Sequence, residues 1–103
     1  MRVWLDDERP MPDSFDWHVT TADGAIALLE TGLVTNISLD HDLGHKENGT
    51  GYDVACWIEQ AAFERRLPRL MWDLHTANPV GMQKMLAALI NANTHWDATD
   101  VAQ

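Results

Sequence analysis

Three short apolar runs in this chain each stop abruptly at polar side chains, and this feature constrains the fold most. The runs are residues 3–5, 37–39 and 70–74, and the residues that follow them are Asp6, Asp7, Asp40, His41, Asp42, His75 and Thr76. Short apolar runs of this kind predict buried strands. Helical connections between such strands favour parallel pairing, and ligands bind outside the carboxyl ends of parallel strands. The sequence therefore predicts that these polar groups meet at one edge of a sheet.

The remaining segments predict the other elements of an α/β fold. Residues 8–16 contain two prolines and are mostly loop, and residues 17–20 form a further short strand. Capping residues and apolar positions at helical spacing predict helices over 21–32, over 50–67 and from residue 78 onward. The order strand, strand, helix, strand, helix, strand, helix predicts a four-stranded, mostly parallel sheet.

A chain of 103 residues accommodates one ordinary domain. We assign residues 1–93 to that domain and residues 94–103 to a C-terminal tail, whose conformation the pattern leaves open. The single cysteine, Cys56, excludes an intrachain disulfide. The N-terminus becomes charged too early for a secretory signal, and no run approaches the ~20 apolar residues of a membrane-spanning helix. We therefore expect a cytoplasmic protein.

The formal net charge of −9 limits the partners of the chain. Such a charge repels the phosphates of duplex DNA and the surfaces of anionic membranes, so neither is an expected partner. A small phosphorylated substrate or an RNA terminus can still bind where a cation neutralises the site locally. The sequence leaves the oligomeric state open.

The aspartates at the strand ends predict a divalent-metal site. Crowded carboxylates repel one another, and a hard cation removes that cost. Mg²⁺ takes oxygen ligands and shares its shell with phosphate oxygens, and Mn²⁺ is also compatible because histidines lie nearby. The predicted ligands are Asp6, Asp7 and Asp40, with the backbone carbonyl of Asp42 completing the site. A single aspartate in such a position would more often be a loop acid or a helix cap.

Other side chains near the strand ends are candidates for handling a phosphate. The histidine side chain as a residue type changes its charge near neutral pH, and His41 and His75 are predicted to act as catalytic base and acid. Thr76 and Asn78 are donors suited to phosphate oxygens, and Arg9 could clamp a phosphate. Each has a common alternative role: a structural histidine, a helix N-cap for Asn78, or a solvated loop arginine for Arg9.

The strand ends resemble the site motifs of response-regulator receiver domains. The resemblance lies in residues 5–7, 38–44 and 74–77, which read Leu-Asp-Asp, Ser-Leu-Asp-His-Asp-Leu-Gly and Leu-His-Thr-Ala. It implies that Asp6, Asp7 and Asp40 hold Mg²⁺. It also implies that Asp40 is the phosphoacceptor and that Thr76 contacts the phosphoryl group.

The same resemblance implies a minimal receiver-like or flavodoxin-like fold of three layers. Residues 8–16 are too short and too rich in proline for the first receiver helix. No fifth strand ending in Lys-Pro follows the last helix, so we expect both elements to be reduced or missing. Because the relay lysine is absent, we do not expect ordinary phosphorelay signalling.

A closer resemblance is to cyclic-phosphate-processing receiver domains. It lies in four segments, residues 4–10, 38–44, 49–53 and 75–79, which together span most of the chain. This resemblance implies metal-assisted processing of cyclic phosphates at RNA ends.

Three functions are compatible with these patterns. The first is a metal-dependent phosphoesterase or phosphodiesterase that acts on the cyclic phosphate of a nucleotide or RNA end, with water or Asp40 as nucleophile. The second is a non-catalytic receiver-like module that binds metal or phosphate and regulates a partner. The third is an acidic mimic of nucleic acid, supported by the net charge alone. It ranks last because a mimic does not need acids at strand ends.

Overall fold

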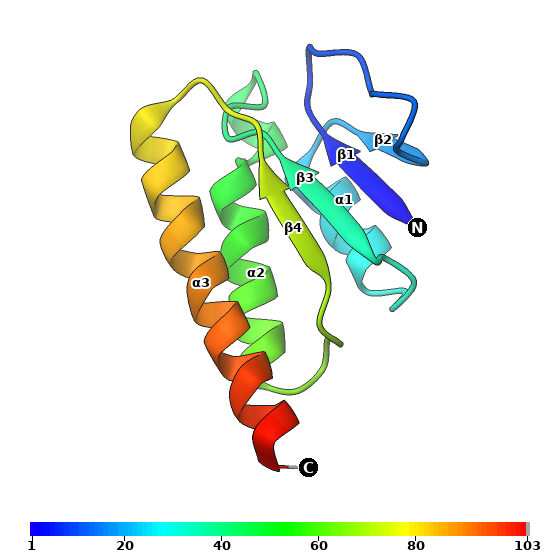
Figure 1. Ribbon diagram of the computed structural model, residues 1–103. Coiled ribbons are helices and arrows are strands. Elements are labelled where there is room, and N and C mark those ends of the chain that lie inside the picture. The colour runs from blue at the N-terminus through cyan, green and yellow to red at the C-terminus, as the bar shows by residue number, and fades with distance from the viewer. Residues whose placement is uncertain (103) are drawn as a thin grey trace.

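The computed structural model describes residues 1–102, with side chains described up to residue 100. Four strands form one parallel sheet in the order β2-β1-β3-β4 (Figure 1). The elements in chain order are β1 (Arg2–Leu5), β2 (Trp17–Val19), α1 (Ala22–Leu29), β3 (Asn36–Leu39), the short 3-10 helix η1 (Lys46–Asn48), α2 (Gly51–Phe63), β4 (Met71–Leu74) and α3 (Pro79–Ala102). The predicted α/β fold with a four-stranded parallel sheet is confirmed.

The three strands that precede the polar groups end level with one another. Leu5 of β1 lies opposite Leu39 of β3, and Leu39 lies opposite Leu74 of β4. The pairing extends one residue further, because Asp40 N donates to the Leu5 carbonyl and His75 N donates to the Leu39 carbonyl, both at 3.0 Å. The residues that follow these strands are therefore fixed side by side at one edge of the sheet.

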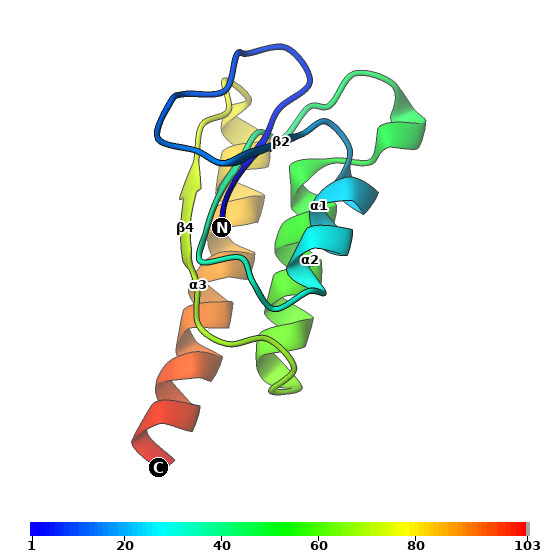
Figure 2. The same ribbon diagram turned by 90° about the vertical axis from the view of Figure 1, so that its right-hand side faces the viewer.

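All three helices cover the same face of the sheet. Successive strand residues point to opposite faces, and Val3, Leu5, Ile37 and Leu39 point into the core between sheet and helices, where they are almost fully buried. Figure 2, which views the sheet close to edge-on, shows α1 and α2 on one side of it. Helix α3 lies on the same side, because Trp72, which is paired with Ile37, donates to Asn93 of α3 at 3.1 Å. The fold thus has two layers where three were expected. The reason is that residues 1–102 contain neither a first receiver helix nor a fifth strand with its helix to cover the other face.

The loop that joins β1 to β2 covers the centre of the opposite face. Trp4 points to this face and is 8% exposed. Its ring meets Phe15 edge-on with centroids 5.2 Å apart, and its indole N–H donates to the Arg9 carbonyl at 3.3 Å. The loop contains no helix, as expected from its prolines. This loop, residues 6–16, thus takes the place of the missing helix and positions Arg9 near the carboxyl edge of the sheet. We call it the strap.

Helix α3 extends well beyond the end of the domain assigned from the sequence. The sequence predicts a tail over residues 94–103, whereas α3 continues without a break through Ala102. Residue 103 lies outside the described residues. Trp96 within this segment is 4% exposed, and its indole N–H donates to the Leu67 carbonyl at 2.9 Å. The segment therefore contributes to the core of the domain.

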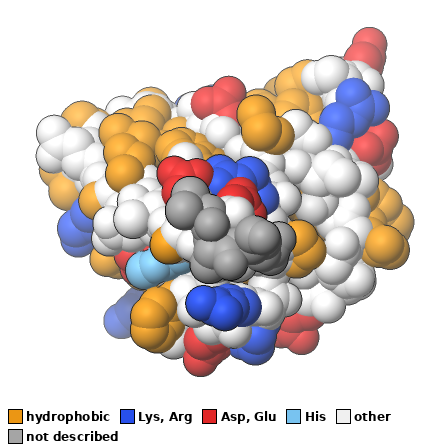
Figure 3. Space-filling view, turned by 60° about the horizontal axis from the view of Figure 1, so that its bottom comes forward, with side chains coloured by type: hydrophobic (Ala, Val, Ile, Leu, Met, Phe, Trp, Pro, Cys, Tyr) orange, Lys and Arg blue, Asp and Glu red, His pale blue; other side chains and the backbone are white. Residues whose placement is uncertain are grey.

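The surface near the end of α3 is mixed in charge. Arg69 pairs with both Asp97 and Asp100 of α3, and Figure 3 shows basic and acidic side chains next to one another on this end of the molecule. Among residues 1–102, no helix is long and apolar enough for a membrane crossing.

Candidate metal and phosphate site

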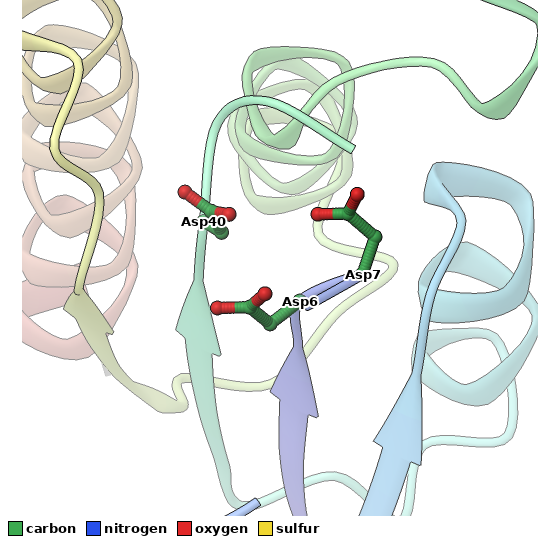
Figure 4. A group of neighbouring side chains, drawn as sticks. All are labelled: Asp6, Asp7 and Asp40. Carbon is green, nitrogen blue, oxygen red and sulfur yellow. The ribbon is translucent and has the colours of Figure 1, made fainter. Parts of the chain in front are cut away.

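Three carboxylates meet at the carboxyl edge of the sheet, as the sequence predicted. Asp6 and Asp7 follow β1 and Asp40 follows the neighbouring β3, and Figure 4 shows the three side chains clustered around one point. One oxygen from each lies within 4.8 Å of the others. Asp6 is fully buried and Asp40 is 5% exposed. Because buried carboxylates this close repel one another, the cluster requires positive charge nearby.

Asp6 accepts four hydrogen bonds. Its Oδ1 accepts from the backbone amides of Glu8 at 2.8 Å and Arg9 at 2.9 Å. Its Oδ2 accepts from Arg9 Nη1 and from His75 Nε2, both at 3.0 Å. Burial alone would raise the pKa of Asp6, but these four donors together hold that pKa below its usual value. Asp6 is therefore ionised and saturated with donors.

Arg9 bridges two of the three carboxylates. Its Nη1 lies 3.0 Å from Asp6 Oδ2 and 3.3 Å from Asp40 Oδ2. The side chain of Arg9 is 46% exposed, while the carboxylates that it contacts are buried. The guanidinium thus supplies part of the positive charge that the cluster requires.

His75 is held by hydrogen bonds at both ring nitrogens. Its Nε2 donates to Asp6, because an ionised carboxylate only accepts, and its Nδ1 accepts from the Ser38 hydroxyl at 2.7 Å. The ring stacks on Trp4 with centroids 3.7 Å apart and planes at 6°. Burial lowers the pKa of His75, and the neighbouring carboxylates oppose that shift only in part. This arrangement fixes the orientation of Asp6, and proton exchange between His75 and a substrate stays a prediction.

The N-terminus of α2 holds the backbone after β3 in place. Gly51 N donates to the His41 carbonyl at 2.9 Å, and a Cβ on Gly51 would overlap the Asp40 carbonyl oxygen. Thr50 and Asp53 form the predicted capping box, with bonds of 3.3 and 2.9 Å. The helix therefore starts where only glycine permits the backbone of Asp40 to approach.

A pocket of about 290 Å³ opens beside the carboxylates. It is lined by Asp7, Glu8, Arg9, Asp40, Asp42, Gly44, Thr76 and Ala77. Thr76 Oγ1 accepts from Asn78 N at 3.2 Å, so its hydroxyl hydrogen is free to be donated to a ligand. Five predicted site residues thus line one pocket, and the buried Asp6 contacts one of them, Arg9.

Two further predicted residues, His41 and Asn78, bond to Asp42 of the pocket lining. Asp42 Oδ1 lies 3.0 Å from His41 Nδ1, and Asp42 Oδ2 accepts from Asn78 Nδ2 at 3.2 Å. The bond from His41, followed by that from Asn78, lowers the pKa of Asp42 despite some desolvation. Asn78 Oδ1 accepts from Gly81 N at 2.9 Å, which makes Asn78 the N-cap of α3. The carboxylate of Asp42 lies outside the cluster of three acids. Coordination of a metal by the backbone carbonyl of Asp42 stays a prediction.

Comparison with known protein families matches residues 1–91 to the cyclic-phosphate processing receiver domain. The chain belongs to this family. The match includes all four strands of the receiver domain and the residues around its pocket. No curated protein and no solved structure shows a significant match. The resemblance to cyclic-phosphate-processing receiver domains, drawn from the four sequence segments, is thereby confirmed.

The carboxylate cluster of this receiver domain has the chemistry of a hard-cation site. Its three acids offer oxygen donors only, which suits Mg²⁺ and Mn²⁺. No group in the described part of the chain donates a hydrogen bond to the carboxylate of Asp7, so its oxygens are available. One guanidinium against three carboxylates leaves formal negative charge in excess, which a divalent cation would balance. The residues present therefore fit such an ion.

Sequence reasoning missed how the receiver domain supports its acids. Ser38 and Trp4 fix His75, yet they read as ordinary members of their strands. The alternation of a strand did contain a signal, because both point away from the helical face. Gly81, in the first turn of α3, was also missed: a Cβ there would overlap the ring of His41.

Proposed function

We propose that this receiver domain hydrolyses a cyclic phosphate on a nucleotide or RNA end with the help of Mg²⁺ or Mn²⁺. The observation that carries the proposal is the cluster of three carboxylates within 4.8 Å, beside a pocket also lined by Arg9 and Thr76. Membership of a family described by cyclic-phosphate processing supports the same substrate class.

In this proposal Asp6, Asp7 and Asp40 hold the cation. A bound divalent cation would polarise the phosphate and lower the pKa of a coordinated water. Arg9 and the Thr76 hydroxyl would bind phosphate oxygens at the pocket wall. Because His75 is bonded on both ring nitrogens, we assign it to holding Asp6. His41, which pairs with the pocket residue Asp42, is the better candidate to protonate the leaving ribose oxygen.

The test is hydrolysis of a panel of 2′,3′-cyclic nucleotides and an RNA with a cyclic phosphate end, with Mg²⁺ or Mn²⁺ supplied. We expect turnover by the unaltered chain and a loss of at least about a hundredfold in kcat/KM for Asp40→Asn, or about 2.7 kcal/mol. Asp73→Asn is the matched control, because it removes the same charge from an exposed strand residue. If metal binds but none of the substrates is opened, the proposed hydrolase is wrong.

A non-catalytic receiver-like module is the second candidate. One observation favours it: the predicted proton carriers, His41 and His75, are both hydrogen bonded within the protein. Treatment with a small phosphoryl donor followed by intact-mass measurement separates the two functions. An added phosphoryl group that is lost in Asp40→Asn would support a phosphate-holding module, provided that the hydrolysis panel shows no turnover.

A further inference from the structure

Every acceptor position of Asp6 is occupied in the structure. A carboxylate has about four lone-pair sites, and Asp6 accepts bonds from Glu8 N, Arg9 N, Arg9 Nη1 and His75 Nε2. A divalent cation that coordinates Asp6 must therefore displace one of these four donors. Which donor leaves determines what else changes when the cation arrives.

The side chain of Arg9 is the donor that can leave. The two amide donors, Glu8 N and Arg9 N, belong to the tight turn after β1. The backbone of this turn is held in place, because the Arg9 carbonyl accepts a hydrogen bond from the indole N–H of Trp4. His75 is 16% exposed, stacks on Trp4 and is tied to Ser38. The Arg9 side chain is 46% exposed and lines the pocket. Its guanidinium can therefore move without disturbing the packing of the core.

We propose that Arg9 is an exchangeable cation that occupies the carboxylates until a divalent ion binds, and then turns into the pocket to bind phosphate. The inference rests on the proposed metal site, although it does not depend on hydrolysis. It assigns Arg9 two successive partners: first Asp6 and Asp40, then the anion that the loaded site receives.

Charge balance explains why the two events are linked. Counted at their formal charges, three carboxylates and one guanidinium leave two negative charges in excess, a field that disfavours a phosphate in the pocket. A divalent cation neutralises that excess and competes with Arg9 for Asp6 Oδ2 and Asp40 Oδ2. The displaced guanidinium then lies beside Asp7 and Thr76 in the pocket lining. There it presents paired N–H donors suited to a phosphate.

The proposal predicts opposite effects of one substitution on two affinities. Arg9→Met removes the competing charge but keeps a long aliphatic side chain. We expect Mn²⁺ to bind about tenfold more tightly, since one charged hydrogen-bonded contact no longer has to be broken. We expect inorganic phosphate to bind the Mn²⁺-saturated variant about tenfold more weakly. Free Mn²⁺ is measured by electron paramagnetic resonance and phosphate binding by calorimetry.

Arg2→Met is the matched control. Arg2 is an exposed arginine at the start of β1, paired with Asp16, and the control removes the same charge from the other end of the strand. Both affinities should change by less than about twofold, because exposed charges far from the site are screened. Arg9→Lys retains the positive charge but lacks the paired N–H donors of a guanidinium. Its Mn²⁺ affinity should therefore stay near that of the unaltered chain.

Each outcome bears on the proposal. Unchanged or weaker Mn²⁺ binding by Arg9→Met would overturn it while leaving the proposed function standing. Tighter Mn²⁺ binding without any hydrolysis would support it while removing the proposed enzyme. Absence of Mn²⁺ binding in every variant would overturn both.

A measurement on the unaltered chain makes the test independent of how the variants fold. Titration with Mg²⁺ should shift the Nε–Hε nuclear magnetic resonance signal of Arg9, because its contacts with Asp6 and Asp40 are lost. The ring signals of His75 should move far less, since its contacts with Ser38 and Trp4 persist. Mg²⁺ binding that leaves the Arg9 signal unmoved would contradict the exchange.

Discussion

At the residue scale, the site depends on side chains that never face the pocket. His75 donates a hydrogen bond to Asp6, Ser38 donates one to His75, and the ring of Trp4 stacks on the ring of His75. A buried polar network of this kind is stable only while every member has its partner. The carboxylate cluster therefore has a rigid base and, in Arg9, one exposed and movable contact.

His75→Phe tests this network. Phenylalanine retains a ring to stack on Trp4, but it leaves Asp6 with one donor fewer and the Ser38 hydroxyl without its acceptor. We expect a loss of about 2 kcal/mol in the free energy of unfolding, measured with urea. His45→Phe is the control, because His45 is exposed, and its effect should stay within about 0.5 kcal/mol. Equal effects of the two substitutions would contradict a supporting role for His75.

The link between β1 and the strap provides a pH-dependent test. Asp16 accepts from the Arg2 side chain and backbone, and the Arg2 side chain, as the larger cause, lowers the pKa of Asp16 below 3.8. A lowered folded pKa stabilises the protein above pH 3.8, and that stabilisation is lost as the pH falls through the folded value. Asp16→Asn should therefore reduce stability slightly at neutral pH and make no difference in acid.

Urea unfolding of the unaltered chain and of Asp16→Asn, at neutral pH and at a pH below the folded pKa of Asp16, provides the measurement. Asp13→Asn, an exposed acid in the same loop, should show no such pH dependence. A deficit of Asp16→Asn that persists unchanged in acid would contradict the pairing.

At the element scale, the start of α2 positions the third carboxylate. The capping box fixes the first turn of the helix, and Gly51 lets that turn press against the backbone that carries Asp40. The end of β3 and the first turn of α2 thus meet at the backbone of Asp40. The location follows the general rule that ligands bind at the carboxyl ends of strands in such sheets.

Gly51→Ala tests that convergence. The added methyl would overlap the Asp40 carbonyl oxygen and lie 2.8 Å from Met85 Sδ. We expect a loss of about 3 kcal/mol in the free energy of unfolding, because the backbone of Asp40 cannot yield as a flexible side chain can. Gly24→Ala in α1 is the control: its methyl would meet side-chain atoms at 3.1 Å or more. The change there should be within about 1 kcal/mol, and a similar loss for both variants would contradict the close approach.

At the scale of the whole molecule, one long helix closes the two-layer fold. The last turns of α3 bury Trp96 and bring Asp97 and Asp100 to Arg69, the residue before Leu70 and β4. The other face of the sheet has only the strap over its centre. A domain of this size has a total stability of about 5–15 kcal/mol. Because the last turns of α3 bury Trp96, we expect them to supply a substantial part of that stability.

Trp96→Ala tests the contribution of these turns. Loss of the buried indole and of its bond to the Leu67 carbonyl should lower the free energy of unfolding by about 4 kcal/mol. A chain that ends at residue 93 should lose cooperative unfolding. Thr94→Ala is the control, since Thr94 is exposed in the same segment, and it should change stability by no more than about 0.5 kcal/mol. If a chain of 93 residues unfolds cooperatively and is equally stable, residues 94–103 are a tail outside the domain, as the sequence predicted.

The sequence by itself determined the strands, the helices and the edge at which the acids gather. These follow from local patterns: apolar runs with definite ends, capping residues at helix starts, and acids directly after strands. Asp6, Asp7 and Asp40 could be grouped in this way because parallel connection fixes which strand ends meet.

Only the tertiary structure decided what surrounds those acids. The pairing of Arg9 with Asp6 and Asp40, and of His75 with Ser38, depends on side-chain contacts between distant segments, which no local period encodes. The placement of all helices on one face, and the continuation of α3 past residue 93, likewise follow from burial against other elements. Local pattern specifies which elements form and where they end, whereas packing between elements specifies which groups come into contact.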